Sequence, residues 1–303
     1  MRNFNFFTWT AVAALLLGSA GASRADVVVK DGETVAFLGD SITAGGVSSP
    51  VGYVNLVASA LKTNDIKIKV VPAGVSGHKS NDMLGRLDHD VIAKKPDWML
   101  VSCGVNDVWH GDNGVPLEKY KTNMTAIVDK AQATGIKVMI LTATVIGEDV
   151  ANPNNKKLID YNAFLRELAK QKNCLLADLN ADFLGVLNDA TKAGNKPGSM
   201  LTADGVHPNA RGHFLMAKGI LRAFGMDEKQ LDKAENVWLD IPGGVNFDVW
   251  KSLTVRQYRQ LEVIAAKQHK EVSALTSQLF SKAIDDLLAQ KANDDAAATM
   301  PAK

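Results

Sequence analysis

The stretch Val35-Ala36-Phe37-Leu38-Gly39-Asp40-Ser41-Ile42-Thr43 joins a short apolar run to a Gly-Asp-Ser sequence. An apolar run of this length that ends at turn residues predicts a buried strand. Ser41 would then follow the strand directly, where a parallel sheet opens to its ligand crevice. A hydroxyl at that place can act as a nucleophile if a base is brought to it. Taken alone, however, the Gly-Asp-Ser sequence favours a turn or helix-capping serine.

The composition is that of a folded globular protein. The 303 residues are 46% hydrophobic and 22% charged, which is enough for one large core or two smaller ones. The formal net charge is +1 and no basic block is present, so nothing supports nucleic acid or a membrane surface as a partner.

Residues 1–25 predict a signal peptide. Arg2 supplies the charged start, Ala11–Ala20 supplies the apolar centre, and Ser23-Arg24-Ala25 offers small residues for cleavage. The apolar run is too short for a good membrane span, so we expect none in the mature chain. The sequence therefore predicts export to the periplasm or the medium, with a retained N-terminal anchor as the alternative.

Apolar runs alternate with helical patterns from residue 34 to residue 223. Such alternation predicts an α/β protein with a five-stranded parallel sheet and helices on both faces. Right-handed crossovers place the carboxyl ends of all strands at one edge. The predicted strands are Thr34–Leu38, Ile66–Val71, Trp98–Cys103, Lys137–Thr142 and Cys174–Asp178. The predicted helices are Gly52–Lys62, Asn81–Lys94, Leu117–Thr134, Lys156–Lys172, Ala181–Ala193 and Ala210–Phe224.

A different pattern follows, and we expect a helical C-terminal extension over residues 226–292. Val237–Pro242 resembles an extended segment before a glycine turn, and Thr254–Gln290 is a long amphipathic helix or helix pair. Packing of this helix on the first domain is favoured, and a homo-oligomer formed through it is the alternative. The polar residues 293–303 predict a frayed, disordered tail.

Cys103 and Cys174 are predicted to be buried thiols. The strand pattern puts one at the end of a parallel strand and the other at the start of a second strand. These positions are at opposite edges of the sheet, too far apart for a disulfide.

The base for Ser41 is predicted in the segment Asp204-Gly-Val-His207-Pro208. A carboxylate three residues before a histidine on a tight loop can accept the Nδ1 proton, which leaves Nε2 free to accept from a nucleophile. For Asp-x-x-His alone, a capped turn with an ordinary loop imidazole is the favoured interpretation.

Donors for an oxyanion are predicted in two further loops. Gly77 offers a backbone N–H without an obstructing side chain, Asn106 offers an amide, and the N–H of Ser41 is a third donor. The plain alternatives are a turn glycine and an Asx-turn asparagine.

Together these blocks resemble the SGNH hydrolases, also called the GDSL esterase family. The four blocks occur in the family order between residues 34 and 224. They predict a hydrolase domain over residues 26–225. They are Gly39-Asp40-Ser41-Ile42, Ser76-Gly77, Gly104-Val105-Asn106-Asp107 and Asp204-Gly205-Val206-His207-Pro208. One departure is Pro72, where the family often has asparagine; that position is structural.

The resemblance implies a flavodoxin-like three-layer α/β/α fold and an esterase without metal or cofactor. By position, Ser41 is the nucleophile, His207 the base and Asp204 its orienting carboxylate. Ser41, Gly77 and Asn106 would form the oxyanion hole. Asp40 and Asp107 are interpreted as structural, and His213 as packed or solvated. His78, Trp109 and His110 are weaker candidates for the rim of the substrate site.

The predicted activity is hydrolysis of a carboxylic ester through an acyl-enzyme on Ser41. Export, the Trp109-His110-Gly111 rim and the lack of a long apolar lid favour a small acyl group on a polar alcohol. The segment Val105–His110 resembles that of bacterial carbohydrate acetylesterases in the family, which implies acetyl on a carbohydrate or oligosaccharide. Lysophospholipase, thioesterase and acyltransferase activities are alternatives on the same site, and a non-catalytic binding module is the alternative from another class.

Overall fold

A computed structural model gives the structure of the chain and describes residues 27–195, 198–242 and 254–298. The chain divides into two compact units, Met1–Val245 and Asn246–Lys303. This division falls after the boundary at residue 225 that the sequence pattern predicts. The predicted signal peptide, residues 1–25, lies outside the described residues.

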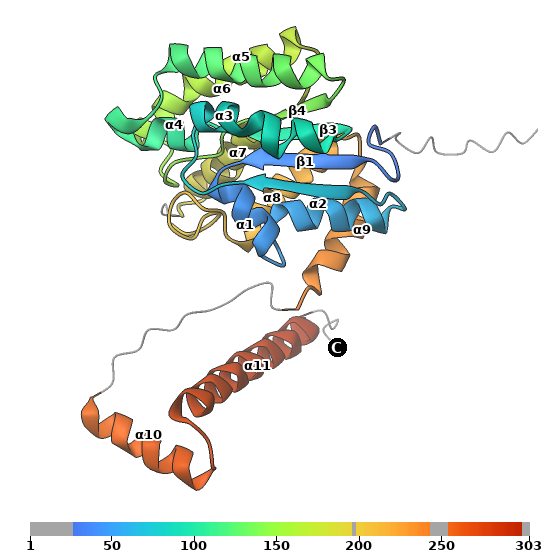
Figure 1. The fold of residues 1–303 in the computed structure, drawn as a ribbon. Coiled ribbons are helices and arrows are strands. Elements are labelled where there is room, and N and C mark those ends of the chain that lie inside the picture. Colours follow the sequence, from blue (N-terminus) through green and yellow to red (C-terminus); the bar gives the residue numbers. More distant parts are fainter. Residues whose placement is uncertain (1–26, 196–197, 243–253, 299–303) are drawn as a thin grey trace, which may run out of the picture. The chain divides into compact units, whose positions relative to one another are not determined.

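The first unit is built on a five-stranded parallel sheet with strand order β2-β1-β3-β4-β5 (Figure 1). The strands are β1 (Thr34–Gly39), β2 (Lys69–Gly74), β3 (Trp98–Ser102), β4 (Lys137–Leu141) and β5 (Leu175–Ala177). This is the flavodoxin-like order, in which ligands bind where the chain reverses direction, between β1 and β3. The predicted fold class is confirmed.

Helices cover both faces of this sheet. They are α1 (Ser41–Ser48), α2 (Tyr53–Thr63), α3 (Ser80–Asp90), α4 (Val105–Trp109), α5 (Leu117–Ala133), α6 (Pro153–Gln171), α7 (Leu179–Lys192), α8 (Ala210–Ala223) and α9 (Glu228–Leu239). Short 3-10 helices span Ile92–Lys94 and Gly111–Asn113. In Figure 1, α3, α5 and α6 lie on one side of the sheet and α2, α8 and α9 on the other. β3 is buried along its whole length, as expected of a central parallel strand.

Strand β2 lies three residues later than predicted, at Lys69–Gly74 in place of Ile66–Val71. The prediction placed Pro72 in the loop after the strand, whereas the strand includes it. Among the described residues β2 is an outer strand that pairs with β1 alone, and Pro72 stands opposite Phe37 in that pair. An outer strand tolerates proline because only one side of its backbone is paired.

The extended segment predicted over Val237–Pro242 is wrong, because α9 runs from Glu228 to Leu239. Its start carries a capping box between Asp227 and Gln230. Leu231, Ala234 and Trp238 recur at helical spacing and are fully buried. The helix therefore packs as part of the first unit.

Two short helices at the carboxyl edge were also not predicted. α1 begins at Ser41 itself, and its Gly45-Gly46 pair is a poor helix former. Gly46 is required there, since a Cβ would lie 2.7 Å from the Tyr53 ring. α4 spans five residues, which is too short to show a periodic pattern.

The second unit holds the helix pair α10 (Val255–Lys267) and α11 (Val272–Ala298). The sequence was compatible with one long helix or with two helices. The structure has two, and the turn between them contains His269 with a left-handed φ of 52°. α11 continues past Asn293, into the segment predicted to be frayed. None of the helices in the described ranges is both long enough and apolar enough to cross a membrane.

Both cysteines are free thiols. Cys103 follows β3 and is buried, whereas Cys174 precedes β5 and is only partly buried. The expectation of two buried thiols therefore holds for Cys103 alone.

Candidate active site

Ser41 is the first residue of α1 and directly follows β1 and Asp40. The Asp40 carboxylate caps the helix, its Oδ1 accepting the Ile42 N–H at 2.9 Å. The Ser41 Oγ lies 2.8 Å from Nε2 of His207, although 166 positions separate the two residues. The hydroxyl at the end of the first strand and the predicted imidazole are thus within proton-transfer distance.

His207 stands on a loop that closes on itself before α8. The loop is joined by an isolated bridge between Thr202 and Pro208 and by an Ala203 N–H donated to the His207 carbonyl at 2.8 Å. Asp204 Oδ1 accepts the backbone N–H of His207 at 2.8 Å, and its Oδ2 lies 2.7 Å from His207 Nδ1. The three-residue spacing therefore brings this carboxylate to the far side of the imidazole.

The charge on Asp204 determines how the His207 ring is protonated. Partial burial raises the pKa of Asp204, but hydrogen bonds from the His207 N–H, the His207 ring and the Val206 N–H outweigh it and lower the pKa to about 2. An ionised carboxylate can only accept, so Nδ1 of His207 carries the proton. Nε2 is then the acceptor that faces the Ser41 hydroxyl.

Gly77 lies on the turn that follows β2. Its φ of +77° is left-handed, which glycine adopts without strain. The N–H of Val75, two residues earlier, donates to the Gly39 carbonyl at 3.0 Å, so this turn is joined to the end of β1 beside Ser41. Within the described ranges no protein acceptor pairs with the Gly77 N–H, which is free for a ligand.

Asn106 lies on α4, at the end of β3, and is 4% exposed. Its Nδ2 donates to the His78 carbonyl at 3.1 Å and to Asp40 Oδ2 at 3.3 Å. Its Oδ1 accepts from His110 Nε2 at 3.2 Å, which fixes the orientation of the amide. An oxyanion bound by Asn106 must therefore share a hydrogen that the protein already accepts, and the longer bond to Asp40 is the weaker one.

The three rim candidates lie next to these groups. His78 Nδ1 accepts from Arg86 Nε at 3.0 Å, so its proton is on Nε2. Trp109 is 45% exposed and meets His110 edge to face, with ring centroids 5.9 Å apart. His78 and His110 thus both hold other residues of the site, and Trp109 offers an exposed aromatic surface.

The two aspartates interpreted as structural are buried and hydrogen-bonded within the protein. Burial raises the pKa of Asp40 to about 6. Burial also raises the pKa of Asp107, which accepts the Ser80 N–H at 3.0 Å and the Ser80 hydroxyl at 2.6 Å. His213 is packed, not solvated: its Nδ1 accepts the Tyr53 N–H, and burial lowers its pKa to about 4.

Two charged residues near the site were missed by sequence reasoning. Arg86 on α3 donates to the carbonyl oxygens of Gly39 and Ala73, at the ends of β1 and β2. Glu148, between β4 and α6, accepts four hydrogen bonds from the segment that leads to Asp204. The only available signal was position, because Glu148 follows a strand at the same carboxyl edge as Ser41.

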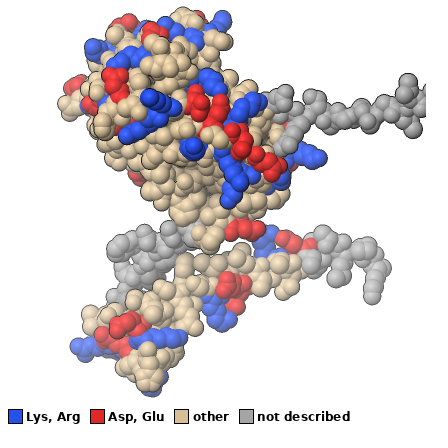
Figure 2. Space-filling view, turned by 45° about the vertical axis from the view of Figure 1, so that its right-hand side comes forward, with Lys and Arg blue, Asp and Glu red and all other residues tan. Residues whose placement is uncertain are grey.

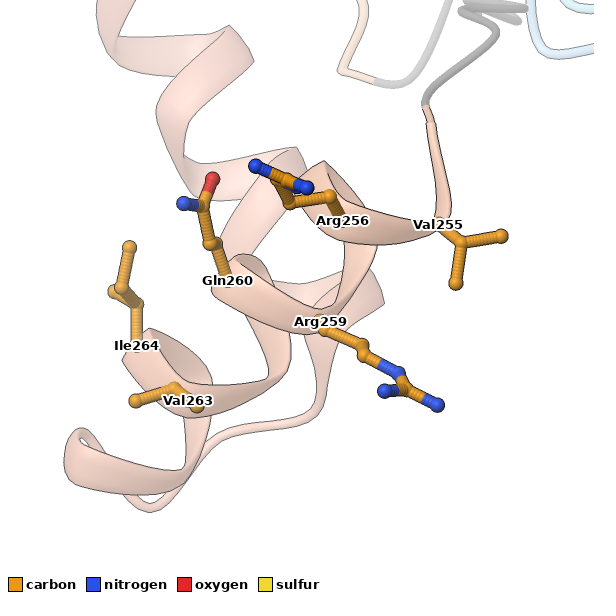
Figure 3. Close-up of a pocket in the computed structure, with 6 residues that line it drawn as sticks. All are labelled: Val255, Arg256, Arg259, Gln260, Val263 and Ile264. Atoms are coloured by element: carbon orange, nitrogen blue, oxygen red, sulfur yellow. The ribbon is translucent and has the colours of Figure 1, made fainter.

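Two further features of the described residues can be compared with this site. A hollow in the surface lies against α10, and its lining side chains come from successive turns of that one helix (Figure 3). They are Val255, Arg256, Arg259, Gln260, Val263 and Ile264. This set contains no nucleophile with a base. In the described ranges, no three His, Cys, Asp or Glu side chains gather as a metal ion requires.

The charged residues of the first unit are mixed in sign. On the face in Figure 2, Lys and Arg side chains are interspersed with Asp and Glu. This distribution agrees with the net charge of +1.

Several known proteins with related sequences or structures are named as esterases. The model of the GDSL-like lipase/acylhydrolase family matches residues 37–215. An acetylxylan esterase of Geobacillus stearothermophilus is 29% identical over 218 residues, which are 66% of this chain and 97% of that protein. Esterase TesA of Pseudomonas aeruginosa is 28% identical over 180 residues, which are 58% of this chain and 80% of that protein. The crystal structure of an acetyl xylan esterase, AlAXEase, matches with a TM-score of 0.59 and 36% identity, covering 63% of this chain and 98% of that one.

Proposed function

The chain belongs to the GDSL-like lipase/acylhydrolase family and is a carboxylic ester hydrolase, and on that premise we propose that it removes acetyl groups from a carbohydrate through an acyl-enzyme on Ser41. The observation that carries the proposal is one chain of hydrogen bonds. Ser41 Oγ is 2.8 Å from His207 Nε2, and His207 Nδ1 is 2.7 Å from Asp204 Oδ2. These are the distances that a serine nucleophile, its base and an orienting carboxylate require.

In the first half of the reaction, Ser41 Oγ attacks the ester carbonyl while His207 Nε2 takes the hydroxyl proton. The carbonyl oxygen becomes negative, and the N–H groups of Ser41 and Gly77 and the Asn106 amide are the donors available to it. Each such donor stabilises the transition state by roughly 3–4 kcal/mol. The tetrahedral intermediate then breaks its bond to the alcohol oxygen, which takes the proton back from His207 and leaves.

In the second half, His207 takes a proton from water, and the resulting hydroxide attacks the acyl carbon. The bond to Ser41 Oγ breaks, Oγ regains its proton from His207, and the carboxylic acid leaves. Asp204 stays ionised throughout and stabilises the imidazolium. Its pKa of about 2 suits this role, because the carboxylate stays ionised at neutral pH.

The substrate class rests on the relatives and on the rim. Two acetylxylan esterases match over 97% and 98% of their own lengths. The half-exposed Trp109 offers an aromatic face, which suits packing against the apolar faces of a sugar ring. The predicted signal peptide supports export to the periplasm or the medium, where the enzyme would encounter polysaccharide fragments.

Ser41→Ala tests the reaction. We expect kcat on p-nitrophenyl acetate and on acetylated xylo-oligosaccharides to fall by about five to six orders of magnitude. If the variant and the parent were equally active, the acyl-enzyme on Ser41 would be ruled out. If both proteins bound the sugar and neither hydrolysed it, a binding module would be favoured.

A series of p-nitrophenyl esters of rising chain length tests the acyl group. We expect kcat/KM to be highest for acetyl and to fall as the chain lengthens. A preference for long chains would favour a lysophospholipase or thioesterase instead.

A further inference from the structure

Glu148 is a buried acid that forms no ion pair among the described residues. It is 6% exposed and lies between β4 and α6. Its Oε1 accepts the N–H of Leu201 at 2.6 Å, the N–H of Thr202 at 2.7 Å and the Thr202 hydroxyl at 2.9 Å. Its Oε2 accepts the Met200 N–H at 2.7 Å. A buried carboxylate is costly unless its oxygens are hydrogen-bonded, and these four donors supply that stabilisation.

The balance of these effects favours the charged form of Glu148. Burial raises its pKa, but the hydrogen bonds from Met200, Leu201 and Thr202 outweigh this, and the pKa lies below its usual value. An ionised carboxylate accepts at both oxygens, so all four bonds persist together.

The residue before Glu148 contacts the same loop at a second place. The Gly147 N–H donates to the Gly205 carbonyl at 2.6 Å. Both glycines have left-handed φ, +73° and +93°, and a Cβ on Gly205 would lie 3.5 Å from Gly147 Cα. Gly205 stands between Asp204 and His207, so the segment Gly147-Glu148 holds the loop both before and within the acid–base pair.

Inside the loop, one bridge, the Ala203–His207 hydrogen bond and the buried side chains of Leu201, Thr202 and Val206 also hold the backbone. The side chains of Asp204 and His207 are 52% and 40% exposed, so burial contributes little to their placement. Residues 198–209, which precede α8, form neither a helix nor a strand apart from one bridge. Proton transfer from Ser41 needs the imidazole within a few tenths of an ångström of its place.

We propose that Glu148 is a positioning residue for ester hydrolysis, which acts through the backbone of Met200–Thr202 to hold Asp204 and His207 against Ser41. This inference rests on the proposed function, because the aligned pair matters only if His207 is the base.

Glu148→Gln is the sharpest test. The glutamine oxygen can replace Oε1, but its amide nitrogen then faces the Met200 N–H, so one bond and the charge are lost. We expect kcat to fall about 10- to 100-fold while KM changes less than about twofold, as for a small misplacement of a catalytic group. An unchanged kcat would overturn the proposal.

Glu33→Gln is the matched control. Glu33 also accepts a backbone N–H and two side-chain donors, from Lys30, Trp98 and Lys137. It lies at the amino-terminal end of β1, at the opposite edge of the sheet from Ser41. We expect this variant to lose stability in urea while its kcat stays that of the parent. An equal fall of kcat in both variants would mean that Glu148 acts through stability alone.

A double-mutant cycle with Asp204→Asn locates the effect. If Glu148 acts through the Asp204–His207 pair, Glu148→Gln lowers kcat by less than about threefold in the Asp204→Asn background. A 10- to 100-fold fall of kcat in both backgrounds would overturn the proposal.

If Glu148→Gln does not fold, Thr202→Val is the second variant, because it removes the hydroxyl that donates to Glu148. An unchanged kcat in Thr202→Val would then decide against the proposal. Failure of the proposed function is recognised separately, by Ser41→Ala retaining the parent's activity.

Discussion

The two sides of the candidate site are held by side chains of opposite charge. On the nucleophile side, which comprises residues 39–48, Gly77 and Asn106, the Arg86 guanidinium donates to backbone carbonyl oxygens. On the base side, residues 200–208, the Glu148 carboxylate accepts backbone N–H groups. Arg86 adds a donor to carbonyl oxygens at the strand ends, where the Gly39 carbonyl also accepts the Val75 N–H, whereas Glu148 supplies acceptors for N–H groups of the irregular loop. Each charged residue therefore matches the kind of backbone group that it faces.

The aspartate on each side shows the same contrast. Asp40 is buried and its pKa is raised to about 6, whereas Asp204 is half-exposed and its pKa is lowered to about 2. The first has few donors to offset the loss of water, and the second accepts three hydrogen bonds at the surface. The nucleophile side thus buries its aspartate, and the base side keeps its aspartate hydrogen-bonded at the surface.

Asp204→Asn should have the largest effect on kcat of the variants that compare the two sides, because it changes the hydrogen bond between Asp204 and His207 on the base side. The asparagine amide would donate to His207 Nδ1 and force the ring proton onto Nε2, which then cannot accept from Ser41. We expect kcat on p-nitrophenyl acetate to fall by about 10⁴-fold.

Asp178→Asn is its control, since Asp178 also accepts several hydrogen bonds but contacts Arg166 and Thr142 instead of the loop. Its kcat should equal that of the parent. If Asp204→Asn kept more than about a tenth of the parental kcat, Asp204 would not be the residue that orients His207.

Asn106→Ala tests the donors of the nucleophile side. Removing one oxyanion donor costs about 10²- to 10³-fold in kcat, with little change in KM. Asn123→Ala is the matched control, because Asn123 is also a buried asparagine but donates to Ser80 Oγ on α3. We expect it to lower the free energy of unfolding and leave kcat unchanged. A kcat for Asn106→Ala equal to that of this control would assign the oxyanion to the backbone N–H groups alone.

Asp40→Asn and Asp204→Asn should change the pH dependence of stability in opposite directions. The raised pKa of Asp40 means that the folded state binds its proton more tightly, so the parent loses stability as pH rises from about 4 to about 6. Asp40→Asn removes this loss, worth roughly 3 kcal/mol at 1.36 kcal/mol per pKa unit. Relative to the parent, the variant should therefore gain that amount between pH 4 and pH 7 in urea unfolding.

For Asp204 the sign is reversed. Its lowered pKa stabilises the folded state above the usual pKa of an aspartate, and this is lost as pH falls toward 2. Asp204→Asn should thus be less stable than the parent at pH 7 and approach it in acid. The same sign for both variants would contradict the contrast between the two sides.

Removal of the second unit should have the smallest effect. Every residue of both sides lies within Met1–Val245, and α9 is packed inside that unit. We expect a chain that ends at residue 245 to keep the parental kcat on p-nitrophenyl acetate, with mass and fold checked by light scattering and circular dichroism. A large loss of kcat in the folded, shortened protein would mean that hydrolysis also depends on residues beyond 245.

The sequence indicated the residues of the candidate site more clearly than the residues that hold them in place. Ser41 and His207 are 166 positions apart, yet they meet because a strand end and a loop at the carboxyl edge of one parallel sheet converge. Their motifs have fixed spacing and could be found by inspection. Glu148 has no motif, because three of its four hydrogen bonds come from backbone N–H groups, which any residue except proline can supply.

The errors in the fold have equally specific causes. Ile66 and Ile68 are apolar and suggested a strand, but they pack in the turn before β2, while Pro72 concealed the true end of that strand. α9 could have been found from Asp227 and Gln230, whose spacing is that of a capping box. α4 was out of reach, since one turn of helix has no period to detect.

Pro72 has a further consequence, for association between copies of the chain. An outer strand with a full row of free N–H and C=O groups invites another chain to pair with it and start an aggregate. Pro72 interrupts that row on β2, and at the other outer position β5 is only three residues long. Both margins of the sheet are therefore poor templates, which favours a protein that stays dispersed at high concentration.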